Sequence, residues 1–343
     1  MKKLISVLLI LVLVCGLMTG CEKAPAKGFS SEPKLRIVTT IFPIYDWVVN
    51  VVGDSSETAE ITMLLDSGVD LHSYQPTADD MVRIAGCDLF IYVGGESDEW
   101  VEDALQEATN KNLRVIDLME VLGDAVKEED TVEGMEAEHD HDHEEDHDHD
   151  EHEEDHDHEE EHEEAEYDEH IWLSLKNASV VCRAIAETLG QAASENAALY
   201  AANADAYIEK LAALDAQYQA VVDAAKHHTF LFGDRFPFRY LADDYSLDYY
   251  AAFVGCSAET EASFETILFL ANKLDELGLP AVLQIESADG SIARTVVENT
   301  RSRDQQILTM NSMQSVTAQD AAGGASYLAI MESNLDVLRT ALG

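Results

Sequence analysis

The chain has 343 residues, 46% of them hydrophobic, and a formal net charge of −47 at pH 7. This length is enough for two domains, each with its own hydrophobic core. So negative a surface repels nucleic acid and anionic lipid, and it attracts cations. The charge is uneven, because 26 acidic and no basic residues lie between Glu128 and Glu169.

The first residues are typical of an export signal. Two lysines precede an apolar run, Leu4 to Leu17, that is too short for a comfortable membrane span. Small residues then precede Cys21, as in the lipobox of bacterial lipoproteins. We predict a signal peptide at 1–20, a lipid on Cys21 and a tether at 21–33, which would place the protein on the extracytoplasmic face of the cell membrane. The alternative is a plain secreted protein.

Short strands alternate with helical patterns up to residue 127, which predicts an α/β lobe with a parallel sheet at 34–127. The predicted strands are Leu35–Thr40, Ile61–Leu65, Leu89–Val93 and Leu113–Leu118, and the predicted helices are Tyr45–Val52, Asp79–Ala85 and Trp100–Asn110. A disordered acidic loop at 128–166 then interrupts this lobe. The segment 167–190 is expected to complete it.

The next segment, 191–228, is rich in good helix formers and contains no proline. A helix over Ser194–Lys226 would be on the order of 50 Å long and would pack along two lobes. A second α/β lobe follows at 229–343. Its predicted strands are Thr229–Phe232, Tyr249–Val254, Ala281–Ile285 and Gln306–Met310, and its predicted helices are Glu261–Leu277, Ser291–Thr300 and Ala325–Leu342.

The predicted architecture is therefore two Rossmann-like α/β lobes bridged by a long rigid helix, with a ligand site in the interlobe cleft. Two histidines are candidates for that site. His72 follows a predicted strand in a turn-rich segment, and His170 lies where the acidic stretch returns to ordered sequence, before an apolar pair. Neutral imidazole is a good zinc ligand. Taken alone, either residue could be an exposed histidine without a role.

The segments around these histidines carry a resemblance. Gly68-Val69-Asp70-Leu71-His72-Ser73-Tyr74-Gln75-Pro76 resembles the G-x-D-P-H-x-Y-x-P signature of the solute-binding proteins of zinc and manganese ABC transporters. Glu169-His170-Ile171-Trp172-Leu173 is similar to their x-H-x-W-L-D-P motif, and zinc members carry a histidine-rich acidic loop between the two. The resemblance implies two α/β lobes and a rigid linking helix. It also implies that His72 and His170 bind metal.

The chain departs from the family pattern at the remaining ligands. Zinc members have a third histidine, and manganese members a glutamate, after the first strand of the second lobe. Here no histidine is present, and Gly233 or Arg235 falls on that position. We take Asp234 as the candidate third ligand, although it could equally pair with a neighbouring arginine. Glu286, at the end of a predicted strand, is a weaker candidate for the fourth.

Five cysteines are present, of which Cys87, Cys182 and Cys256 would remain after removal of the signal and lipidation. No C-x-x-C motif occurs, so a thiolate zinc cluster is not expected. The odd number allows at most one internal disulfide.

The acidic loop contains nine histidines and almost no apolar residues, so it cannot fold by itself. We predict that they form weak auxiliary sites for zinc, nickel or copper. A solvated spacer is the alternative. The nine are His139, His141, His143, His147, His149, His152, His156, His158 and His162.

The sequence thus predicts a monomeric zinc receptor that delivers Zn²⁺ to an ABC permease and its ATPase subunit. A manganese or iron receptor is the alternative within the family, because the third histidine is missing. A surface adhesin, a metal buffer and a metalloenzyme are alternatives from other classes. An enzyme is not expected, since the chain lacks G-x-S-x-G and P-loop motifs.

Overall fold

The first lobe is built on a parallel sheet with strand order β2-β1-β3-β4. The computed structural model of the chain describes residues 34–53, 58–136, 166–257 and 261–343. The elements up to residue 125 are β1 Leu35–Thr39, α2 Phe42–Val52, β2 Ala59–Met63, η2 Leu71–Ser73, α3 Ala78–Gly86, β3 Leu89–Tyr92, η3 Glu96–Asp98, α4 Trp100–Gln106, β4 Arg114–Asp117, α5 Leu118–Leu122 and η4 Gly123–Ala125. The parallel sheet and its four strands confirm the sequence prediction.

The hydrophobic runs of the two central strands explain this sheet. Residues on both faces of β1 and β3, such as Ile37, Val38, Phe90 and Ile91, are buried. Continuous apolar runs of this kind are expected where helices cover both faces of a parallel sheet. Chain order also matters, because β1 lies between β2 and β3. The connections that follow β1 and β3 therefore leave in opposite directions, and ligands bind at the carboxyl ends of the strands beside such a switch point.

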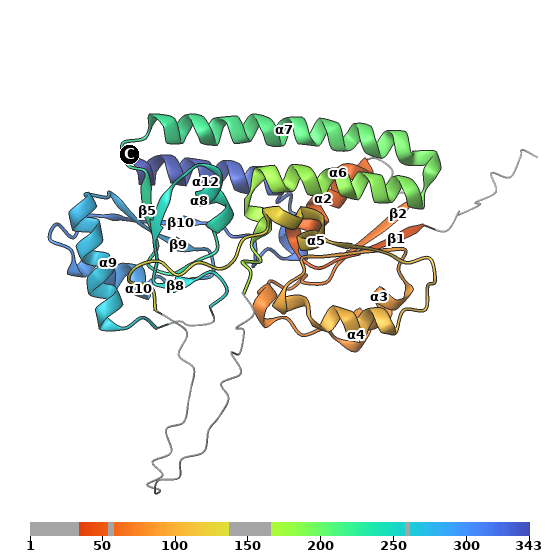
Figure 1. The fold of residues 1–343 in the computed structure, drawn as a ribbon, viewed down its shortest axis with the longest axis horizontal. Coiled ribbons are helices and arrows are strands. Elements are labelled where there is room, and N and C mark those ends of the chain that lie inside the picture. Colours follow the sequence, from red (N-terminus) through yellow and green to blue (C-terminus); the bar gives the residue numbers. More distant parts are fainter. Residues whose placement is uncertain (1–33, 54–57, 137–165, 258–260) are drawn as a thin grey trace, which may run out of the picture. The chain divides into compact units, whose positions relative to one another are not determined.

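Two helices, not one, follow the second histidine motif. After η5 (Ile171–Leu173), α6 runs over Leu175–Ala192, and η6 (Ser194–Asn196) leads into α7 over Ala197–Ala224. Ala193 leaves helical geometry with φ −136° and ψ 78°, and the chain doubles back so that α7 lies beside α6 (Figure 1). The predicted long helix is therefore present, although it is shorter than predicted at both ends.

Helix α7 is hydrogen-bonded to both lobes. On the first-lobe side, Tyr207 Oη donates to Asp46 Oδ2 at 3.2 Å. On the second-lobe side, Tyr218 Oη donates to the carbonyl oxygen of Met331, in α12 (Tyr327–Leu342), at 2.7 Å. The helix of 28 residues is about 42 Å long. It thus links the two lobes as predicted.

The second lobe is built from parallel pairs β9–β10, β5–β7 and β6–β8, and a parallel bridge between Phe232 and Leu283 joins the first two pairs. Its elements are β5 Thr229–Leu231, β6 Arg235–Phe236, α8 Arg239–Asp244, β7 Asp248–Tyr250, β8 Phe253–Val254, α9 Phe264–Leu277, β9 Ala281–Ile285, α10 Ser291–Asn299, β10 Gln306–Met310, α11 Ala318–Ala322 and α12 Tyr327–Leu342. The single strand predicted over Tyr249–Val254 is wrong, because it is divided into β7 and β8. The short elements β6, α8 and α11 were not predicted.

One large hydrophobic cluster runs through both lobes, and a smaller one lies under α9 and α10. The shared cluster includes Trp47 of α2 and Tyr327 of α12, whose ring centroids are 5.2 Å apart. Within the described residues, no helix has the length and apolar character needed to cross a membrane. The predicted signal peptide, Cys21 and the nine histidines of the acidic loop lie outside the described residues.

Candidate metal centre

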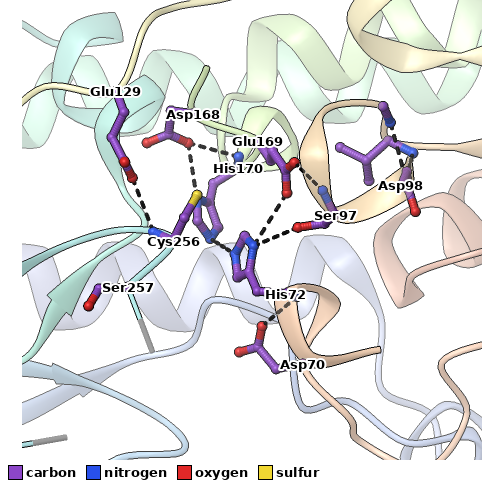
Figure 2. Close-up of polar contacts among 12 residues, drawn as sticks. Asp70, His72, Ser97, Asp98, Glu129, Asp168, Glu169, His170, Cys256 and Ser257 are labelled. Atoms are coloured by element: carbon purple, nitrogen blue, oxygen red, sulfur yellow. Dashed lines mark hydrogen bonds and ion pairs between the residues drawn. The ribbon is translucent and has the colours of Figure 1, made fainter. Parts of the chain in front are cut away.

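The loop after β2 positions His72. The side chain of Asp70 caps η2 and accepts a hydrogen bond from the backbone nitrogen of His72 at 3.1 Å. The neighbouring Leu71 is buried and anchors the turn. The imidazole Nδ1 then lies 2.8 Å from Ser97 Oγ and 3.3 Å from Glu169 Oε2, which fixes the ring orientation (Figure 2). Only 11% of the His72 side chain is exposed.

His170 is held even more tightly. Asp168 Oδ1 accepts from both the backbone nitrogen and the ring Nδ1 of His170, at 2.8 and 3.0 Å. The segment that follows is anchored in the second lobe, because Trp172 Nε1 donates to the carbonyl oxygen of Ser312 at 2.8 Å. His170 itself is fully buried. The apolar pair after His170 therefore locks it in place, as the sequence suggested.

The two imidazoles face each other through their free nitrogens. His72 Nε2 and His170 Nε2 are 3.2 Å apart, although the residues are 98 positions apart in sequence. Ionised carboxylates only accept hydrogen bonds, so the carboxylate beside each Nδ1 places the ring proton there. Both Nε2 lone pairs then point into the same space, where they repel unless a cation or a proton lies between them. Two nitrogens bound to one tetrahedral zinc would be roughly 3.3 Å apart, given Zn–N bonds of about 2.0 Å.

A cysteine of the second lobe completes this group. The sulfur of Cys256 and the imidazole nitrogens of His72 and His170 all lie within 4.8 Å of one another. It is the one such group of three found in the described part of the chain. The sequence does not predict this residue as a ligand, because a thiolate zinc site is expected from a C-x-x-C motif and the chain has none. Its position two residues after the end of a second-lobe strand, beside a glycine, is the signal that could identify it.

Gly255 allows the strand end to approach His170. A Cβ on Gly255 would lie 3.1 Å from two atoms of the His170 ring and 2.9 Å from the carbonyl oxygen of Phe236. Backbone oxygen cannot move away cheaply, so a larger residue here would push the Cys256 loop away from the histidines. The backbone nitrogen of Cys256 donates to Glu129 Oε1 at 3.2 Å, which holds the loop from the other side (Figure 2).

An acidic cavity of about 300 Å³ opens onto these residues. Its lining comprises His72, Glu96, Ser97, Glu129, Glu166, Tyr167, Glu169 and Cys256. Four glutamates on the wall of a small cleft concentrate cations near its base. Burial raises the pKa of Glu169, but hydrogen bonds from His72 and Ser97 outweigh burial and hold that pKa below its ordinary value. Burial raises the pKa of the Cys256 thiol, and the charge of Glu129 adds to this rise.

The structure does not bring Asp234 into the histidine group. Its Oδ1 accepts from the backbone nitrogen of Arg235 at 2.9 Å, and its Oδ2 accepts from the backbone nitrogen of Ile285 at 3.0 Å. The second bond ties the segment between β5 and β6 to the end of β9. Asp234 lines a separate cavity of about 470 Å³, together with Asp70 and Arg235. Its role as a ligand stays a prediction.

Glu286 is also engaged elsewhere. Its carboxylate accepts from the backbone nitrogen of Ser312 at 2.7 Å and from the hydroxyl groups of Ser312 and Ser315 at 3.0 and 3.2 Å. It thus fixes the loop after β10, against which Trp172 packs. As a metal ligand, Glu286 remains a prediction outside the group that the structure assembles.

Arg235 occupies the region where the family pattern places its third ligand. Its guanidinium forms an ion pair with Asp70 across the two lobes, and both side chains are largely buried. A second nitrogen of the group lies 3.5 Å from the carbonyl oxygen of Ser257. Arg235 therefore connects the loop of His72 to the loop of Cys256 without offering a metal ligand itself.

Three comparisons with known proteins agree with this geometry. A family model described as zinc-uptake complex component A periplasmic matches residues 37–341. The zinc-binding lipoprotein AdcA of Streptococcus pneumoniae is 30% identical over 96% of this chain, which spans only 60% of that relative. The high-affinity zinc uptake system protein ZnuA of Bacillus subtilis is 28% identical, over 98% of this chain and 96% of that protein.

Among solved structures, the Zn(II)-bound ZnuA-like domain of S. pneumoniae AdcA matches with a TM-score of 0.66 and 26% identity, over 90% of this chain and 99% of that domain. The described chain and that zinc-bound domain therefore share a fold.

Proposed function

Because this chain belongs to the family of zinc-uptake complex component A proteins, we propose that it is a high-affinity zinc receptor. It binds Zn²⁺ in the interlobe site and delivers it to the permease and ATPase subunit of an ABC importer. Zinc is its cargo and not a catalytic cofactor. A lipid on Cys21 would hold the receptor, as a monomer, at the extracytoplasmic face of the cell membrane.

A single observation carries this proposal: the two opposed Nε2 atoms, 3.2 Å apart, with both Nδ1 atoms turned toward carboxylates. Carboxylate–histidine pairs of this kind set the tautomer and raise the basicity of metal-binding imidazoles. Nitrogen ligands favour zinc over manganese, which prefers oxygen. Among the described residues, no carboxylate belongs to the group of His72, His170 and Cys256. This supports the zinc assignment over manganese or iron.

The lobe boundaries follow from the same proposal. Residues 34–127 and 167–190 would form the lobe that supplies the two histidines, and 229–343 the lobe that closes over them. Metal bound to both lobes would hold them together, and docking on the permease would then release it. Imidazole must be deprotonated to bind zinc, so zinc affinity falls in acid.

The nine histidines of the acidic loop would act as a weak reservoir for zinc. Glu166, the last residue of the predicted loop, lines the acidic cavity, and its carbonyl oxygen accepts from the backbone nitrogen of Glu129 at 2.8 Å. An ion released near this point would enter a cleft that already attracts cations. Growth of a strain lacking Glu136 to Glu164, in scarce zinc, separates this role from that of a spacer, which would leave growth unchanged.

The receptor function is tested by zinc affinity in three full-length variants. Zinc is titrated against a strong chelator, which strips ions from weak sites. His72→Ala and His170→Ala should each lose more than about 100-fold in affinity, since even the outer partners of metal ligands contribute 10–100-fold. His228→Ala, which changes an exposed histidine, should match the wild type. Retention of one tightly bound zinc by both site variants would contradict the proposal.

A further inference from the structure

We propose that Cys256 is the ligand that the second lobe contributes, as a thiolate, to a two-histidine, one-cysteine zinc site. This inference rests on the proposed function and specifies its site. It starts from Arg235, which lies near the third-ligand position of the family and cannot bind a cation. A receptor that closes around zinc still needs a ligand from the second lobe. In the described residues, the only candidate assembled with both histidines is Cys256.

The geometry of the sulfur fits this role. It lies within 4.8 Å of the His72 and His170 nitrogens and approaches from the opposite lobe (Figure 2). Zinc–sulfur bonds of about 2.3 Å and zinc–nitrogen bonds of about 2.0 Å would place the ligand atoms roughly 3.5 Å apart. A movement of about 1 Å by the Cys256 loop would therefore complete the site. Such a movement is part of lobe closure on the ion.

The surroundings of Cys256 are built to present it. Gly255 lets the backbone touch the His170 ring, and Glu129 accepts from the backbone nitrogen of Cys256. The adjacent Ser257 carbonyl faces the Arg235 guanidinium, whose other partner, Asp70, caps the turn of His72. The two loops that carry metal ligands are thus linked through one arginine. Arg235 is a positioning residue in this arrangement.

Cys256 also differs from the other described cysteines. Cys87 and Cys182 are buried in the first lobe, whereas Cys256 is partly exposed at the acidic cavity. All three are free thiols. When zinc binds, a Zn–S bond forms as the S–H bond breaks, and the proton leaves to the water of the cavity. No oxidant or reductant is needed.

A thiolate ligand has a consequence for selectivity. Soft sulfur favours zinc and cadmium and disfavours manganese. The third histidine of the zinc members and the glutamate of the manganese members are thus replaced here by a softer donor. Three protein ligands leave a fourth position open, through which the ion could pass to the permease.

The test uses cobalt as a spectroscopic substitute for zinc in the full-length chain. Wild type and the control Cys87→Ala should show sulfur-to-cobalt charge-transfer absorption in the near ultraviolet, and Cys256→Ser should lose it. The acidic loop contains no cysteine, so cobalt held there contributes no such band. Cys256→Ser should also lose at least about 100-fold in zinc affinity. Its preference for zinc over manganese should fall in parallel.

A second variant, Cys256→His, tests the same ligand if the serine variant folds poorly. It should retain tight zinc binding, through a third nitrogen, while the charge-transfer band disappears. An unchanged cobalt spectrum and zinc affinity in Cys256→Ser would overturn the cysteine assignment. If His72→Ala nevertheless lost zinc, the proposed receptor function would stand without Cys256 as a ligand. Retention of zinc by His72→Ala and His170→Ala would instead overturn the receptor function.

Discussion

The two lobes meet the metal centre with different chemistry. In the first lobe, each histidine has a carboxylate behind it, Glu169 for His72 and Asp168 for His170, and its free nitrogen faces the centre. In the second lobe, the carboxylates of Asp234 and Glu286 already accept hydrogen bonds from backbone amides and hydroxyl groups. A polar residue at the carboxyl end of a strand is thus only a candidate metal ligand. Its remaining hydrogen-bond partners decide whether it can bind an ion.

The largest effect on stability is expected at the connection between the lobes. Arg235→Ala removes the partner of Asp70, whose side chain is only 21% exposed, and leaves a charge in a poorly solvated place. We expect a loss of about 3 kcal/mol in the free energy of unfolding, measured by urea denaturation without metal. Arg183→Ala breaks an exposed pair with Asp205 and should cost less than about 0.5 kcal/mol. Equal losses in the two variants would show that the Arg235 pair has no special role.

The contrast between carboxylates can be tested by matched substitutions. Asp168→Asn keeps an acceptor for the backbone of His170 but removes the charge behind its ring. Zinc affinity should fall about 10- to 100-fold. The carboxylate of Asp234 accepts hydrogen bonds from the backbone nitrogens of Arg235 and Ile285. Asp234→Asn should therefore leave zinc affinity unchanged. A large loss in Asp234→Asn, measured by chelator competition, would restore Asp234 as a ligand.

A smaller effect should appear at Asp98, behind the Ser97 loop. Burial raises the pKa of Asp98 to about 7, against hydrogen bonds from the backbone of Gly94 and Val93 that lower it. The folded state therefore favours the protonated carboxyl. Its stabilising contribution is complete below about pH 4, the unfolded value, and is lost as pH rises through about 7.

Asp98→Asn removes this dependence. Between about pH 5 and about pH 6, the stability of metal-free wild type relative to Asp98→Asn should fall by roughly 1 kcal/mol. Urea denaturation of both proteins at the two pH values measures it. A difference that stays constant, or grows in favour of the wild type, would show that Asp98 is ionised in the folded chain at both values.

The sequence predicted His72 and His170 as candidate ligands, and the structure brings their Nε2 atoms to 3.2 Å from each other. Metal binding by the two residues stays a prediction. Flanking turn residues placed His72 after a strand, and the apolar pair after His170 marked it as ordered. Both signals are local in the sequence, so they can be recognised without knowledge of the fold. The parallel strands of the first lobe were predicted for the same reason, since each is a continuous apolar run.

The second half of the site depends on contacts that the sequence does not encode locally. Strands β6 and β8 have two residues each, too few to show a periodic pattern. Cys256 lies two residues after the end of β8, and its partners lie 86 and more positions away. The engagement of Asp234 with Ile285 joins two strands that only the folded lobe brings together. Asp234 therefore resembled a ligand more than Cys256 did.

His72 and His170 should bind one zinc ion between the lobes. Crystals of the zinc-loaded chain, measured at the zinc absorption edge, locate the ion by its anomalous signal. One strong peak bonded to both Nε2 atoms is expected. A strong peak bonded to Asp234 or Glu286, with none between the imidazoles, would contradict it.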